Sequence, residues 1–158
     1  MLFRSNHVSK AGPVKLAIVA PDGRDGMLAH ARQLHEAGIP FIFDPGQGMP
    51  MFDGDDLKQF IDLATWVTLN DYESELMQDR TGLTPAAIAE RVQACIVTRG
   101  GEGSNIYTRD GQLDIPSAVP TAVTDPTGCG DAYRAGLLYG LTHGLPWATT
   151  GRIASLLG

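Results

Sequence analysis

The chain has 158 residues, of which 43% are hydrophobic and 19% are charged, and its formal net charge is −6. This length fits one domain, and the composition is that of an ordinary globular protein. The acidic balance excludes the basic surface that nucleic acid or an anionic membrane would need, and no apolar run is long enough to span a bilayer. Two cysteines, and a start without the apolar core of a signal peptide, predict a cytoplasmic location.

Short apolar runs alternate with helical spacing along the chain. Residues 1–13 show no period, and we expect them to be a lead-in to a domain at 14–158. Strands are predicted, in order, at 14–20, 40–43, 65–69 and 94–98, followed by a hairpin of 104–107 and 112–115. Helices are predicted at 27–37, 55–63, 71–78, 85–91 and 132–141, with a last helical stretch from 146 to the end.

This alternation predicts an α/β fold with a mostly parallel sheet and helices on both faces. Ligands bind such sheets beyond the carboxyl ends of the strands. That rule selects five residues: Asp22, Asp44, Asn70, Gly100 and Asp131. Glycines at positions 136, 140 and 144 recur on the helix that begins at 132, and we expect them to let this helix pack closely against the sheet.

A glycine turn before the helix at 132–141 has the features of an anion site. Gly128, Cys129 and Gly130 immediately precede Asp131. Unpaired N–H groups at a helix start, together with the helix dipole, favour a bound phosphate. An aspartate would repel that phosphate, so its presence indicates a base that takes a proton from an attacking hydroxyl. A helix cap without a catalytic role is the alternative.

The stretch from Asp125 to Asp131, followed by Tyr133 and Ala135-Gly136, resembles the second signature of the PfkB, or ribokinase-like, family of carbohydrate and nucleoside kinases. Positions 126 and 129 hold Pro and Cys where that signature has Thr and Ala. The resemblance implies a three-layer α/β/α sandwich. It also implies an enzyme that transfers a phosphoryl group from ATP to a hydroxyl of a sugar or nucleoside.

The resemblance implies roles for single residues in this signature. Asp131 would be the general base, and the N–H groups of residues 128–130 would form the anion hole. Asp125 would help to bind a monovalent cation such as K⁺, and Thr127 would contact ATP. No Gly-x-x-x-x-Gly-Lys-Ser/Thr motif is present, so the protein is not a P-loop enzyme, and the four histidines show no metal-ligand spacing.

Two further stretches resemble the same family. Asn70 and Glu73 match its Asn-x-x-Glu motif, which implies that they hold Mg²⁺ through water, since this ion keeps several of its waters. A helix cap at Asn70 is the alternative. The second stretch matches a Val-Thr-x-Gly-x-x-Gly turn and implies that Thr98, Gly100 and Gly103 contact the nucleotide. An ordinary turn into the hairpin is the alternative.

The loop at Asp44 differs from that of many family members, and this difference bears on the substrate. Many members of the family have Asp-x-Asn-x-Arg at this loop. This sequence has the Asp but neither the Asn nor the Arg, a difference that favours nucleosides such as adenosine as substrates.

The resemblance begins near residue 14, and the family is longer at both ends. We therefore expect an exposed sheet edge, self-association into a homo-oligomer, and no phosphate transfer by this chain alone. A non-catalytic remnant that binds a nucleotide or a partner chain is the alternative function.

Overall fold

The computed structural model describes residues 7–118 and 127–158. Within these residues, six strands form one sheet whose spatial order follows the sequence. The strands are β1 (Ala17–Val19), β2 (Phe41–Phe43), β3 (Trp66–Asn70), β4 (Ala94–Thr98), β5 (Ser104–Thr108) and β6 (Gly111–Ile115). Strands β1 to β4 are parallel to one another, β5 is antiparallel to β4, and β6 is antiparallel to β5. The predicted α/β fold with a mostly parallel sheet is confirmed.

In the same ranges, the α-helices are α1 (Arg24–Glu36), α2 (Gly54–Leu63), α3 (Asp71–Thr81), α4 (Pro85–Ala89), α5 (Cys129–Thr142) and α6 (Trp147–Leu157). The hydrophobic pattern does not predict the three short 3₁₀ turns, which are η1 (Val8–Ala11), η2 (Gly46–Met51) and η3 (Gly100–Glu102). Helix α5 begins before its predicted start, and α3 continues to Thr81, where Gly82 with φ 74° ends it. No described helix has both the length and the apolar character of a membrane span.

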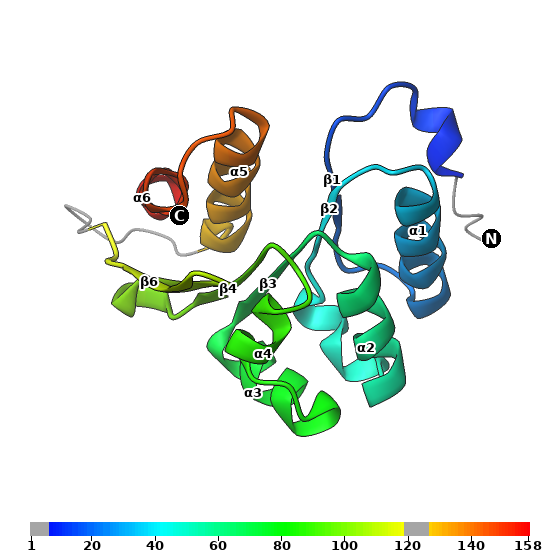
Figure 1. The fold of residues 1–158 in the computed structure, drawn as a ribbon, viewed down its shortest axis with the longest axis horizontal. Helices are drawn as coiled ribbons and strands as arrows, with labels where there is room; N and C mark the ends of the chain where they lie inside the picture. The colour runs from blue at the N-terminus through cyan, green and yellow to red at the C-terminus, as the bar shows by residue number, and fades with distance from the viewer. Residues whose placement is uncertain (1–6, 119–126) are drawn as a thin grey trace.

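The order of the strands decides which face of the sheet each helix covers. Each of the first three crossovers leads to the neighbouring parallel strand, and such crossovers are right-handed. Helices α1 to α4 therefore pack on one face. The antiparallel hairpin then reverses the path, and α5 and α6 pack on the opposite face (Figure 1). This arrangement is the predicted three-layer α/β/α sandwich.

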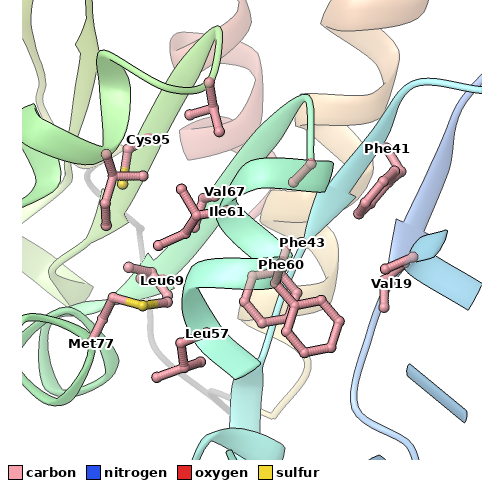
Figure 2. Close-up of a cluster of buried hydrophobic side chains, with 14 of the residues drawn as sticks. Val19, Phe41, Phe43, Leu57, Phe60, Ile61, Val67, Leu69, Met77 and Cys95 are labelled. Atoms are coloured by element: carbon pink, nitrogen blue, oxygen red, sulfur yellow. The ribbon is translucent and has the colours of Figure 1, made fainter. Parts of the chain in front are cut away.

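Strand β2 contributes side chains to both sides of the sheet. Phe41 and Phe43 face the side of α1 and α2, Ile42 faces the side of α5, and all three are fully buried. The ring of Phe43 stacks on Phe60 of α2 with the ring centroids 4.1 Å apart (Figure 2). Because β2 is held in this way, the next residue, Asp44, has a defined position at the carboxyl edge of the sheet.

Two glycines of α5 allow α6 to approach closely. A Cβ on Gly136 would lie 2.8 Å from the backbone N of Ala154, and one on Gly140 would lie 2.7 Å from the Cβ of Thr150. The prediction that these glycines pack the helix against the sheet is therefore wrong, because they face another helix. Gly144 lies beyond the end of α5 with φ 63°, where a Cβ would meet nothing, so it serves the turn between the two helices.

We predict that Gly136→Ala lowers the free energy of unfolding by about 1–3 kcal/mol, the usual range for overpacking. Alanine favours a helix by up to about 1 kcal/mol over glycine, but that gain is smaller than the cost of the new contact. The added methyl group meets the backbone of Ala154, which no change of rotamer relieves. Urea unfolding followed by circular dichroism measures the effect. Gly101→Ala is the control, because a Cβ there meets nothing within 4 Å, and equal stability of the two variants would contradict this explanation.

Candidate active site

A cleft of about 840 Å³ lies at the carboxyl ends of β1, β2 and β3, between the η2 loop and the first half of α5. Its lining includes Asp44, Asn70, Glu73, Asp131 and Arg134. Three of the five strand-end residues selected from the sequence therefore meet in one cleft. The other two, Asp22 and Gly100, lie outside its lining.

Asn70 and Glu73 form a capping box at the start of α3. The Oδ1 of Asn70 accepts a hydrogen bond from the Glu73 backbone N–H at 2.7 Å, and Oε2 of Glu73 accepts one from the Asn70 backbone N–H at 2.9 Å. The side chains also bond directly, because Nδ2 of Asn70 donates to Oε1 of Glu73 at 3.0 Å. The helix cap considered from the sequence is therefore present, and the same two residues line the cleft.

The Glu73 carboxyl is buried, and desolvation raises its pKa, against a lowering by the hydrogen bond from the Asn70 backbone N–H. Both of its oxygens already accept a hydrogen bond. Among residues 7–118 and 127–158, no three His, Cys, Asp or Glu side chains are grouped so that they could hold a metal ion. These donors therefore fit Mg²⁺ held through its own water molecules better than Mg²⁺ bound directly.

Helix α5 opens with a left-handed glycine and no side-chain cap. Gly128 has φ 84°, which glycine adopts without strain, and it occupies the N-cap position. Cys129, Gly130 and Asp131 follow as the first helical residues, whose N–H groups have no intrahelical acceptor. All of them are exposed, and the Asp131 carboxylate is 92% exposed where it borders the cleft. This turn can bind an anion, and the adjacent carboxylate can accept a proton.

Arg134 is a cleft residue that the sequence patterns do not indicate. Its Nη2 donates to Oδ1 of Asp44 at 2.9 Å, and its Nε contacts Oδ2 of the same carboxylate. Asp44 is only 2% exposed, and burial raises the pKa of its carboxyl while Arg134 lowers it. Arg134 follows Asp131 by three residues on the same helix, and this spacing is the one signal that could have placed both side chains on the cleft side.

The turn after β4 lies outside the lining of the cleft. Thr98 donates its hydroxyl to the Leu69 carbonyl at 3.4 Å. Gly100 and Gly103 have φ of 53° and 90°, and a Cβ on Gly103 would lie 2.7 Å from the backbone N of Ser117. Packing alone therefore accounts for the glycine at 103. Contacts from Thr98, Gly100 and Gly103 to a nucleotide stay a prediction.

Two predicted site residues precede α5. Thr127 is the residue before the left-handed glycine, and its side chain is exposed. Asp125 lies outside the described residues. Its predicted role in binding a monovalent cation therefore stays a prediction.

Known proteins share both the sequence and the fold of this chain. It is 37% identical over 113 residues to a nucleoside kinase of Methanocaldococcus jannaschii, which covers 72% of this chain and 37% of that protein. Its fold resembles that of the Burkholderia thailandensis nucleoside kinase in complex with inosine, with a TM-score of 0.94 and 56% identity over 96% of this chain and 50% of that chain. The solved nucleoside kinase of M. jannaschii superposes with a TM-score of 0.85 at 32% identity, over 89% of this chain and 47% of that chain.

The chain spans half the length of these relatives or less. The model of the pfkB family of carbohydrate kinases matches residues 4–158, a range that includes every residue of the cleft. The strand order, the cleft at the carboxyl edge and the glycine turn before α5 agree with that match. The chain therefore belongs to the pfkB carbohydrate kinase family.

Proposed function

We propose that this chain is the phosphate-binding part of an ATP-dependent kinase that phosphorylates a hydroxyl of a nucleoside. The observation that carries the proposal is the exposed Asp131 carboxylate beside the N–H groups of the glycine turn. A base next to an anion site suits transfer of a phosphoryl group to a hydroxyl. The similar kinase of B. thailandensis has been solved with inosine and with ADP-inosine, which favours a nucleoside over a free sugar as the acceptor.

In the proposed reaction, Asp131 takes the proton of the acceptor hydroxyl while the hydroxyl oxygen attacks the γ-phosphorus of ATP. The bond between that phosphorus and the bridging oxygen breaks, and ADP leaves. The N–H groups of the turn at residues 128–130 donate to the non-bridging oxygens and stabilise their charge. Positioning and charge neutralisation supply most of the catalysis in such transfers, so a small, preformed turn suffices.

The finer assignments rest on the family resemblance together with the cleft. Asn70 and Glu73 would hold the waters of Mg²⁺, which neutralises phosphate charge, and Asp125 would help to bind K⁺. The proposed nucleotide contacts are Thr98, Gly100, Gly103 and Thr127. We further propose that the kinase acts in the cytoplasm. Because β1 is an edge strand, copies of this chain would associate through that edge.

The proposal is tested with this chain and with a fusion that adds the part of the B. thailandensis kinase that the chain does not cover. We expect the fusion to convert ATP to ADP in the presence of inosine, and the chain alone to give no signal above background, because it covers half of that relative. A coupled assay measures ADP release. A fusion that folds and binds ATP but phosphorylates neither inosine, adenosine nor ribose would favour the non-catalytic alternative and contradict the proposal.

We predict that Asp131→Asn in the fusion lowers kcat by about 10²–10⁴-fold, the usual contribution of a positioned base. Asparagine keeps the size of the side chain, no side-chain cap of α5 is lost, and the repulsion between this side chain and the phosphate is removed. Nucleotide affinity, measured by calorimetry, should therefore stay equal or rise. Asp25→Asn is the matched control, because Asp25 is an exposed acid in the first turn of α1. Near-parental turnover of Asp131→Asn would contradict its role as the base and leave Asp131 as an acidic residue in the first turn of α5, where Gly128 is the N-cap.

We predict that Glu73→Gln raises the Mg²⁺ concentration needed for half-maximal turnover of the fusion and leaves the fold intact, since Gln can replace Glu in a capping box. Burial raises the folded-state pKa of the Glu73 carboxyl, so the stability that its protonated form provides is lost as the pH rises through that pKa. The Tm of the variant minus that of the parent should therefore increase from about pH 4 to about pH 8. An unchanged Mg²⁺ dependence would leave Glu73 with the capping role alone.

A further inference from the structure

Arg134 is the one cationic side chain among the described residues that line the cleft, and its charge interacts with Asp44, Glu73 and Asp131. Its side chain is 23% exposed, so much of the guanidinium is removed from water. A buried ion pair of this kind seldom stabilises a fold more than apolar side chains of the same size would. Its presence in a ligand cleft therefore needs an explanation beyond stability.

The contacts of the guanidinium leave one of its nitrogens directed away from Asp44. The Nε and Nη2 atoms meet the two oxygens of the Asp44 carboxylate. The third nitrogen, Nη1, lies 3.8 Å from Oδ1 of Asp131, which is an ion-pair distance but too long for a hydrogen bond. Each terminal nitrogen of arginine carries two N–H donors, so Nη1 has the capacity to bind an anion.

Gly130 shows where this nitrogen lies relative to the anion site. A Cβ built on Gly130 would be 2.6 Å from Nη1 of Arg134. Nη1 is therefore directly beside the first turn of α5, whose N–H groups have no intrahelical acceptor. The hydrogen bond from Nη2 and the ion pair with Asp44 restrain the guanidinium in this place. A side chain at position 130 would displace it, which gives that glycine a second reason beyond the turn itself.

We propose that Arg134 is an anion-binding residue of this site and that Asp44 positions it. With one edge of the guanidinium on Asp44, Nη1 donates to a phosphoryl oxygen of the nucleotide held by the N–H groups of the glycine turn. Arginine suits this task because its planar group can bind a carboxylate on one edge and a phosphate with the remaining donors, which lysine cannot do. The inference rests on the proposed function for the identity of the anion as a nucleotide phosphate.

The test uses the double variant Asp44→Asn/Arg134→Gln of the 158-residue chain. It removes one charge of each sign, so the net charge of the cleft is unchanged and neither member of the Asp44–Arg134 pair is left charged without the other. We expect the affinities for ADP and for pyrophosphate, measured by calorimetry, to fall by about tenfold to a hundredfold, which is the loss of one charge-assisted hydrogen bond. The affinity for adenosine, which carries no phosphate, should not change. Arg32→Gln, which removes an arginine bonded to Gln59 outside the cleft, should bind all three ligands like the parent.

Three results would overturn the inference. The first is an unchanged affinity for ADP and pyrophosphate in the double variant. The second is an equal loss for adenosine and ADP with a lower Tm, which would make the pair a structural link between β2 and α5. The third is a parent chain that binds neither ADP nor pyrophosphate. Failure of the proposed function gives a different pattern, in which ADP binding depends on Arg134 but the fusion transfers no phosphate.

Discussion

Four parallel strands taken in sequence order are the constraint on which the rest of the structure depends. Because crossovers between parallel strands share one hand, α1 to α4 lie on one face, and the other face is left for the helices that follow the hairpin. The same order brings the carboxyl ends of β1, β2 and β3 to one edge, where α5 also begins. The cleft is a consequence of this topology, and residues from distant parts of the chain meet in it.

The two helix starts at the cleft differ in how their N–H groups are satisfied, and this difference separates the roles that we propose for them. At α3, the side chain of Asn70 accepts a hydrogen bond from the Glu73 N–H, so part of the helix end is already occupied. At α5, the N-cap is Gly128, which has no side chain to accept one. The N–H groups of α5 are thus left for a ligand, and the positive end of the helix dipole faces the same place. For this reason, the glycine turn is the better of the two candidates for the proposed anion site.

The charges of the cleft explain why a nucleotide would need help from cations. One guanidinium faces three carboxylates, and burial raises the pKa of two of them, Asp44 and Glu73. Asp44 and Arg134 carry opposite charges and are paired with each other. The remaining carboxylates are negative and would repel phosphate, so the proposed Mg²⁺, the N–H groups of α5 and the Nη1 donors of Arg134 would act together on the bound anion.

The sequence by itself determined the strands and most helices, the parallel sheet, the capping residues of α3 and the glycine turn, because periodicity and turn chemistry act within a few residues. The family signature could likewise be recognised from adjacent residues. Only the tertiary structure decided that Arg134 contacts Asp44, ninety residues earlier, since that contact depends on how α5 crosses the end of β2. It also decided that Gly136 faces α6 and not the sheet. A glycine in the sequence shows that space is needed, but which neighbour fills that space depends on how the helices pack against one another.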